Sequence, residues 1–417
     1  MNSFSRNYIF GKFKDFYCDS STVIPAPSAI SQREFAFLLL KEKAMVRHRS
    51  VAKISNLKSL FKENVPSDVY HSCAYYENPE ADMDKKGWLG ADLVFDIDAD
   101  HIPTTCDKIH DEWTCGKCGF AGKGITPEVC PACEGQKFEL KSWPCESCVA
   151  SARDEAVKLV DILEKDLGIS SEDLHIFFSG HRGYHVQVEN DDLKPLDSIA
   201  RREIVDYVYG TGLMGSEEKR VGKKAKKSSE RSLLLHDFGW SKRIKAGMKK
   251  FILNATEEDY REIGIKQNVK GILLNKEAIA TRYIEENRWT GIKGVGAGIE
   301  TWLKIARHVK DLESAKIDTV VTTDIHRLIR MNGTLHGKTG LKKIEFPVNR
   351  LLDFDPFKEA VAFKEGTVKV SVSSAPEFRI GENMFGPYTN KTVELPTAAA
   401  VLLILKGRAE LADEEHV

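Results

Sequence analysis

Residues 91–100, ADLVFDIDAD, form a short apolar run that ends in a cluster of carboxylates, the most informative pattern in the chain. Its apolar residues predict a strand, and side chains alternate between the two faces of a strand. We therefore expect Asp96 and Asp98 to point the same way, and Phe95 and Ile97 to point into the core. Neighbouring carboxylates repel each other unless a cation lies between them. Oxygen ligands of this kind favour a hard divalent cation, Mg²⁺ or Mn²⁺.

Two simpler interpretations of this stretch are a solvated strand end and the start of a calcium loop. A calcium loop that began at Asp96 would need Gly at its sixth position and Glu at its twelfth. Those positions hold His101 and Asp107, so the pattern does not favour calcium.

Composition describes an ordinary globular protein of 417 residues, with 42% hydrophobic and 29% charged residues, enough for one large domain with appendages or for several smaller ones. The net charge of −1 gives no whole-chain signal of nucleic-acid binding. The longest apolar run, residues 398–405, is far shorter than the roughly 20 residues that span a bilayer. Residues 1–6 lack the apolar segment of a signal peptide. We therefore expect no membrane partner and no secretion, and interpret the nine cysteines as intracellular thiols.

Seven of the nine cysteines lie between residues 106 and 148. The knuckles at 115–118 and 130–133 are both Cys-x-x-Cys, a spacing that lets two thiolates reach one ion from a tight turn. Together they predict a closed zinc ribbon, because a redox motif would instead be a lone Cys-x-x-Cys that opens a helix after a strand.

A third knuckle, residues 145–148, has no partner in that ribbon, and the remaining ligands are Cys106 and His110. We therefore predict two structural zinc sites with complete ligand sets. The first site, Zn1, comprises Cys106, His110, Cys145 and Cys148, and the second, Zn2, comprises Cys115, Cys118, Cys130 and Cys133. Pairing of the knuckles across these sets is the main alternative.

Local patterns predict the other elements. Residues 1–52 contain an initial helix, a turn at 25–27 and a helix-to-strand passage, and apolar residues at helical spacing predict a helix from 149 that stops at Gly168. Residues 174–178 and 184–188 are expected strands joined by a turn. A polar, lysine-rich region with few strands follows from 195 to 300.

In that region, the basic run 219–227 is most simply a solvated loop, with a nucleic-acid contact as the second interpretation. Residues 294–298 are glycine-rich, but no strand precedes them, which favours a joint over a dinucleotide site. Compact structure resumes at 317–322 and continues through a helix over 324–330. Pro396 opens a last helix, and residues 410–417 form an acidic tail.

Two glycine-containing turns could bind phosphate. Residues 179–185, SGHRGYH, bring together a hydroxyl, a guanidinium and an imidazole, and glycine allows a phosphate to approach the backbone closely. Residues 336–340, HGKTG, form a second such loop. The simpler interpretation of each is a turn whose polar side chains face water.

In this order along the chain, the acidic strand, the zinc knuckle and the two turns closely resemble the catalytic small subunit of archaeal and eukaryotic-type DNA primases. The resemblance runs from residues 33–35 to the last helix and is weakest across 195–300. It implies a DNA-dependent RNA polymerase that synthesises short primers de novo on single-stranded DNA during replication. Two cations about 4 Å apart would activate the attacking hydroxyl and neutralise the triphosphate in such a reaction.

The resemblance also implies roles for individual residues. Asp96 and Asp98 match the paired metal ligands, and Asp318 is the best match for a third carboxylate. Asp324 is the alternative, although it looks like the first residue of the helix expected at 324–330. The residues that match the nucleotide site are Ser179, Arg182, His185, Arg330, His336 and Lys338, with Arg47 near a phosphate and Asp68 near the ribose. Zn1 matches the zinc knuckle of the family, whereas the Zn2 ribbon is an addition to its shorter versions.

We thus expect a mixed α/β (α+β) fold whose central mixed sheets carry the acids. Residues 1–105, 149–194 and 300–417 should form the catalytic core, 106–148 a zinc-binding module, and 195–299 a mostly helical insertion. The implied partners are a primase large subunit, a single-stranded DNA template, and ribonucleoside or deoxyribonucleoside triphosphates, in an archaeal-type cytoplasm at the nucleoid.

Two other functions fit part of the pattern. A primase-polymerase of repair or plasmid type would keep the same site but extend existing ends. A non-enzymatic zinc-ribbon protein that binds nucleic acid would explain the cysteines and lysines, but not the acids beside a phosphate-binding turn.

Overall fold

The computed structural model describes residues 1–213, 238–267, 269–285, 295 and 297–412. The basic run 219–227, part of the glycine-rich segment 294–298 and the end of the acidic tail lie outside the described residues. Contacts divide the chain into two units, one made of Met1–Val157, Ser170–Arg202 and Ile317–Val417, the other of Lys158–Ile169 and Glu203–Lys316. The zinc-binding module thus falls within the first unit. The second unit includes Lys158–Ile169, and its longer segment, Glu203–Lys316, is displaced toward the C-terminus relative to the insertion predicted at 195–299. No helix in the described part of the chain is both long and apolar enough to cross a membrane.

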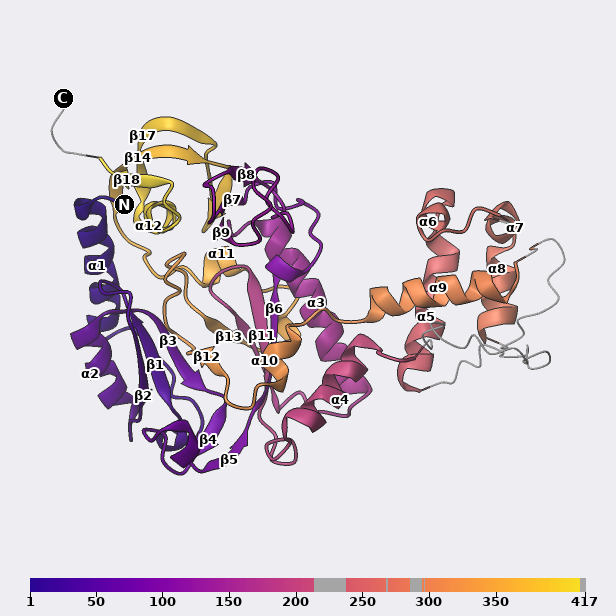
Figure 1. Ribbon diagram of the computed structural model, residues 1–417, viewed down its shortest axis with the longest axis horizontal. Coiled ribbons are helices and arrows are strands. Elements are labelled where there is room, and N and C mark those ends of the chain that lie inside the picture. The colour runs from indigo at the N-terminus through magenta and orange to yellow at the C-terminus, as the bar shows by residue number, and fades with distance from the viewer. Residues whose placement is uncertain (214–237, 268, 286–294, 296, 413–417) are drawn as a thin grey trace. The chain divides into compact units, whose positions relative to one another are not determined.

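Two four-stranded sheets form the centre of the first unit (Figure 1). The sheet that we call the front sheet has the order β12 (Leu328–Arg330), β3 (Pro66–Ser72), β1 (Phe35–Leu39) and β2 (Met45–Arg49). The acid sheet has the order β13 (Ile344–Phe346), β10 (Leu174–Phe178), β11 (Gly183–Val188) and β6 (Leu93–Asp98). The strands predicted around Asp96 and at 174–178 and 184–188 are therefore present, the last beginning one residue earlier.

The predicted mixed α/β fold class is confirmed. Within it, every pairing between named strands of the described residues is antiparallel, so the sheets themselves are not mixed as expected. A period of two identifies the buried face of a strand but does not report the direction of its neighbour. In the acid sheet, β10 and β11 form a hairpin, and β13 and β6 pair with its two outer edges.

Smaller elements complete the first unit. Helices α1 (Ser3–Cys18) and α2 (Ile54–Asn64) lie beside the front sheet in Figure 1. The two helices pack together through Tyr17 and Phe61, whose ring centroids are 5.3 Å apart. The remaining strands are β4 (Ala74–Tyr76), β5 (Trp88–Ala91), β7 (Glu112–Cys115), β8 (Ala121–Lys123), β9 (Phe138–Lys141), β14 (Thr367–Ala375), β15 (Phe378–Ile380), β16 (Asn383–Phe385), β17 (Tyr388–Pro396) and β18 (Ala409–Leu411). The remaining helices are α10 (Thr319–Thr323), α11 (Pro356–Glu359) and α12 (Thr397–Leu405). Pro396 caps α12 as predicted.

Two predicted elements were wrong. The segment 324–330 is not a helix, because α10 ends at Thr323 and β12 follows, pairing Ile329 with His71 of β3. Asp318, not Asp324, caps the helix, since its carboxylate accepts from the backbone N–H of Val320 at 2.9 Å. The helix-to-strand passage within residues 33–50 consists instead of the antiparallel strands β1 and β2.

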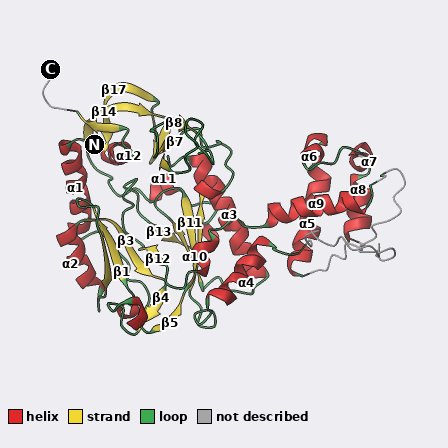
Figure 2. Ribbon diagram, in the orientation of Figure 1, coloured by secondary structure: helices red, strands yellow, loops and turns green. Residues whose placement is uncertain are grey.

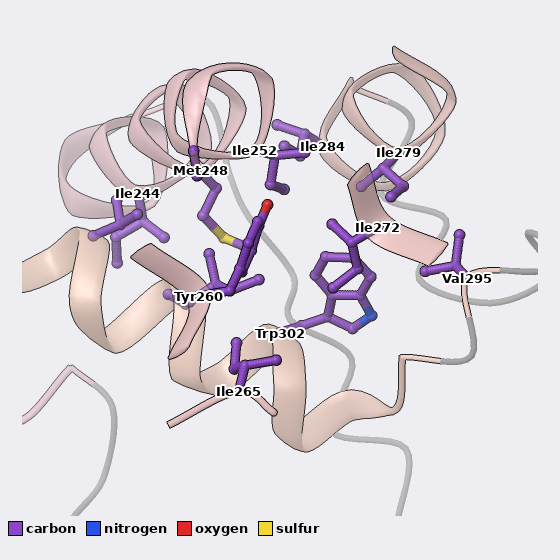
Figure 3. Packing of buried hydrophobic residues seen from close by; sticks show 14 of the residues in the cluster. Ile244, Met248, Ile252, Tyr260, Ile265, Ile272, Ile279, Ile284, Val295 and Trp302 are labelled. Atoms are coloured by element: carbon purple, nitrogen blue, oxygen red, sulfur yellow. The ribbon is translucent and has the colours of Figure 1, made fainter. Parts of the chain in front are cut away.

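The second unit is helical in its described residues and contains no strand there, as Figure 2 shows. Helices α3 (Glu146–Lys165) and α4 (Ser198–Tyr209) end in it, and it contains α5 (Gly239–Asn254), α6 (Glu257–Glu262), α7 (Val269–Leu274), α8 (Lys276–Ile279) and α9 (Ile299–Glu313). Figure 3 shows side chains of these helices meeting in one core, where Met248, Ile272 and Trp302 are fully buried. The unit therefore has a hydrophobic core of its own.

Candidate active site

One cavity of the first unit, about 230 Å³, lies where the end of β6, the β10–β11 turn, β12 and the loop after it meet. Its wall is made by Tyr70, Asp96, Asp98, Asp100, Ser142, Ser179, His181, His185, Val321, Arg327, Leu328, Ile329, Arg330, His336 and Lys338. A larger cavity of about 480 Å³ lies beside Zn1, but it includes none of the predicted catalytic aspartates or nucleotide-binding residues. Because the smaller cavity has acids on one wall and basic and hydroxyl side chains on the other, it is the candidate active site.

The acidic wall comes from alternation along β6. Phe95 and Ile97 are fully buried in the core, whereas Asp96 and Asp98 reach the cavity. Pairing with β11 sets His185 opposite Asp96, with His185 Nε2 3.5 Å from an Asp96 carboxylate oxygen. Burial, together with the charges of Asp98 and Asp318, raises the pKa of Asp96 to about 7, and burial also raises the pKa of Asp98. The wall therefore carries negative charge that the surrounding protein does not neutralise.

Asp318 lies next to this wall at the start of α10. Its backbone N–H donates to the carbonyl oxygen of Asp96 at 2.8 Å, which fixes the helix against β6. Asp324 follows the other end of α10, and its carboxylate accepts from the backbone of His326 at 3.0 Å. Among the described residues, only the Zn1 and Zn2 sets bring three or more candidate ligand atoms within 4.8 Å of one another. The carboxylate oxygens of the three aspartates, Asp96, Asp98 and Asp318, therefore do not all lie as close together as the ligand atoms of the zinc sets.

The β10–β11 turn forms the opposite wall and needs glycine at its tip. Gly180 has φ of +90°, and a Cβ there would lie 2.8 Å from the Cβ of His336. The hydroxyl of Thr339 donates to the carbonyl oxygen of Gly180 at 2.6 Å, which ties the turn to the 336–340 loop. The rings of His181 and His336 stack with centroids 5.2 Å apart, and the Nζ of Lys406 lies 2.7 Å from Nε2 of His181. The two predicted phosphate-binding loops therefore form one surface.

Arg182 differs from the expectation that its guanidinium faces a bound phosphate. Its side chain is fully buried, is absent from the cavity wall, and forms ion pairs with Asp100 and Asp111. Both carboxylates come from segments distant in sequence, so the turn motif alone could not reveal this orientation.

Asp68 also lies behind the wall rather than on it. Its buried carboxylate forms an ion pair with Arg330 and accepts from the backbone of Gly337 at 3.0 Å and from the hydroxyl of Ser67 at 2.8 Å. Burial alone would raise the pKa of Asp68, but the charges of Arg330 and His336 hold it below its usual range. Asp68 therefore fixes both Arg330 and the 336–340 loop.

Arg47 is not on the cavity wall. It lies on β2 at the edge of the front sheet, its side chain is 44% exposed, and its Nε is 3.2 Å from the carboxylate of Glu34.

Seven cysteines and His110 group as Zn1 and Zn2, and pairing across the sets does not occur. In Zn1, His110 Nε2 is 3.0 Å from Cys145 Sγ, and Cys106 Sγ is 3.6 Å from Cys148 Sγ. The sulfur atoms of Zn2 are similarly close, and all ligand atoms of each set lie within 4.8 Å of one another. These sets fit tetrahedral metal sites.

Eight residues of the cavity wall were not among the predicted site residues, namely Asp100, Ser142, His181 and Arg327, together with Tyr70, Val321, Leu328 and Ile329. Asp100 continues the two-residue spacing of the acids and His181 falls within the quoted turn 179–185, so both had a sequence signal. Arg327 lay in the segment predicted as a helix over 324–330. Ser142 follows the zinc ribbon and had no sequence signal.

Comparison with known proteins agrees with this geometry. A sequence model described as the DNA primase small subunit matches residues 141–348. The DNA primase small subunit PriS of Nitrosopumilus maritimus is 32% identical over 413 residues, which cover 99% of this chain and 100% of that protein. The PriS proteins of Cenarchaeum symbiosum and Archaeoglobus fulgidus are each 32% identical, over 96% and 95% of this chain and 97% and 96% of their own lengths. The chain therefore belongs to the DNA primase small subunit family, and it is a primase subunit with nucleotidyltransferase activity.

Proposed function

We propose that this subunit synthesises primers by metal-dependent nucleotidyl transfer in the cavity between β6 and the β10–β11 turn. The observation that carries the proposal is the uncompensated carboxylate pair, Asp96 and Asp98, facing basic and hydroxyl side chains across one cavity. Phosphoryl transfer needs both walls, because the triphosphate must be neutralised while the attacking hydroxyl is activated.

Asp96 and Asp98, assisted by Asp318, are the residues that would hold two Mg²⁺ or Mn²⁺ ions. The fit rests on the donor set, since carboxylate oxygens suit these hard cations. It rests also on the raised pKa of Asp96, which reflects burial and the neighbouring charges of Asp98 and Asp318. When bound, such cations lower the pKa of the attacking 3′-hydroxyl and neutralise the phosphates.

The nucleotide triphosphate would lie against Ser179, His185, Arg330, His336 and Lys338, all of which line the cavity. Burial lowers the pKa of His185 well below its ordinary value, so its imidazole is neutral. Its Nδ1 is buried without a hydrogen-bond partner among the described residues. A buried polar atom without a hydrogen-bond partner costs free energy, and a bound substrate would supply that partner.

Three predicted residues act from outside the cavity wall. Asp68 orients Arg330 on the side where the ribose would lie, and Arg182 supports the acidic wall from behind. Arg47, half-exposed on β2, would meet a phosphate of the second nucleotide that primer initiation requires.

Zn1 and Zn2 are closed four-ligand sites without an open position, which suits structural zinc rather than catalysis. The relatives are named small subunits, which supports a large subunit as the partner of this chain. The remaining proposed partners are single-stranded DNA and ribonucleoside or deoxyribonucleoside triphosphates, and the proposed place of action is the nucleoid in the cytoplasm.

A matched pair of substitutions tests the metal assignment. Asp318→Asn removes the charge beside Asp96 but keeps an N-cap side chain of nearly equal strength. Asp324→Asn makes the same chemical change at the other end of α10. Template-directed incorporation of labelled nucleotide should fall steeply in Asp318→Asn and stay near the wild-type rate in Asp324→Asn. Wild-type incorporation by Asp318→Asn would contradict the assignment.

A further inference from the structure

Asp111 directly follows the Zn1 ligand His110, and its buried carboxylate connects three segments of the first unit. Its Oδ1 accepts from His110 Nδ1 at 2.9 Å and from the backbone N–H of Trp143 at 2.8 Å. The same oxygen accepts from Arg182 Nη1 at 3.0 Å, while Oδ2 is 2.8 Å from Arg182 Nη2. The carboxylate of Asp111 thus binds Nδ1 of the zinc ligand His110 and both terminal nitrogens of the Arg182 guanidinium.

Arg182 links Asp111 to the acidic wall of the cavity. Its side chain is 0% exposed, and Nη2 also binds the carboxylate of Asp100, which lines the cavity. The backbone N–H of Asp100 in turn donates to a carboxylate oxygen of Asp98 at 2.9 Å. A continuous series of polar contacts therefore runs from the Zn1 ligand His110 to the proposed metal ligand Asp98.

The charges in this series explain why it is needed. Asp98 and Asp100 are like charges two residues apart, and they would repel each other without a cation nearby. Arg182 neutralises Asp100 at that point, but a buried guanidinium is itself costly unless it is well paired. Asp111 supplies the second carboxylate, and its orientation depends on His110 and Trp143.

We propose that Asp111 is a positioning residue for the catalytic acids, which it holds in place through Arg182 and Asp100. Zn1, by fixing His110 and the loop that carries Asp111, thereby sets the geometry of the divalent-cation site across the cavity wall. The inference rests on the proposed role of Asp96 and Asp98 and adds a function to the zinc site that the relatives' names do not assign.

Asp111→Asn tests the inference with an isosteric change. The carboxamide oxygen retains the bonds from His110 and Trp143, so zinc should stay bound. Its NH₂ group, however, would face Arg182 Nη2 across the former 2.8 Å contact, donor against donor. Loss of an outer partner of a metal site lowers metal affinity by about 10- to 100-fold, and we expect a loss of that size in Mn²⁺ affinity.

The measurement is the electron paramagnetic resonance signal of free Mn²⁺ during titration of the zinc-loaded protein, with zinc content determined on the same sample. Asp107→Asn is the matched control, because Asp107 is exposed in the same loop, whereas Asp111 is buried against Arg182. Arg182→Lys keeps the charge but loses the fork. It should weaken Mn²⁺ binding as well, with full zinc content.

Wild-type Mn²⁺ affinity in zinc-loaded Asp111→Asn would overturn the inference. If Asp111→Asn loses zinc, the Mn²⁺ affinity of Arg182→Lys is the test, and a wild-type value there would overturn the inference. A wild-type protein that binds no Mn²⁺ would instead overturn the proposed function, so the two failures are distinguishable.

Discussion

Asp68→Asn tests how the basic wall of the cavity is held. The carboxylate of Asp68 is buried, with the residue 7% exposed, and it forms an ion pair with Arg330, whose side chain is 12% exposed. The substitution preserves shape but removes the charge, so the guanidinium of Arg330 is left in a largely dry site without its counter-ion.

The size of the effect follows from burial. Removing one partner of a buried ion pair costs about 3–5 kcal/mol. We expect about 3 kcal/mol, the lower end, because Arg330 reaches the cavity and the asparagine can keep the bond from the backbone of Gly337. The double variant Asp68→Asn/Arg330→Met removes both charges. It should be less destabilised than the sum of the two single variants, as expected when the pair interacts directly.

Hydrogen exchange of the β3 amides, followed by mass spectrometry, is the appropriate assay, because the two units need not unfold together and a single melting curve would mix them. A loss of about 3 kcal/mol corresponds to exchange about 100-fold faster where exchange requires unfolding of the first unit. Unchanged exchange rates in Asp68→Asn, or strictly additive losses of stability in the double variant, would show that the Asp68–Arg330 ion pair does not stabilise the first unit.

The same pair predicts a dependence on pH. The pKa of Asp68 is lower in the folded protein than in the unfolded chain, so ionised Asp68 stabilises the fold above the unfolded value of about 4. That contribution is lost as the pH falls below 4 toward the folded pKa. The difference in the free energy of unfolding between wild type and Asp68→Asn should therefore be largest near neutral pH and decrease as the pH falls below 4.

Two further predictions concern the zinc sites and the cavity. Elemental analysis should find two zinc ions in the wild type and one in Cys130→Ser, because Zn1 and Zn2 share no ligand; a single zinc in the wild type would contradict the two sites. Burial, with Arg182 and Lys338 nearby, lowers the pKa of Lys406 to about 7, and a triphosphate bound beside its partner His181 would raise it. The nucleotide KM of the wild type should therefore increase as the pH rises above about 7, and Lys406→Met should lose that dependence. An unchanged pH profile of KM in Lys406→Met would show that the charge of Lys406 does not contribute to triphosphate binding.

Sequence-local features were predictable because they depend on spacing alone. The strand that carries Asp96 and Asp98 follows from alternation, and the hairpin at 174–188 follows from two apolar runs around a glycine turn. The zinc groups follow from Cys-x-x-Cys spacing and from counting the remaining ligands.

Features that depend on distant partners were not predictable. The direction of Arg182 is set by Asp111 and Asp100, which lie 71 and 82 residues away along the chain. The segment around Arg330 reads as a continuation of a helix, but it becomes a strand because β3 offers an unpaired edge. The antiparallel direction of the sheets and the place of Arg47 on an edge strand likewise depend on pairings that no local pattern encodes.

Primer-free synthesis on a single-stranded DNA template tests whether this chain initiates primers at Asp96 and Asp98. Labelled nucleotides and Mg²⁺ or Mn²⁺ would be supplied to the wild type, to Asp96→Asn and to Asp191→Asn, a control at a surface carboxylate that is 93% exposed. We predict short products from the wild type and Asp191→Asn, and none from Asp96→Asn with its zinc content intact. Products made by Asp96→Asn at the wild-type rate would show that Asp96 is not required for primer synthesis.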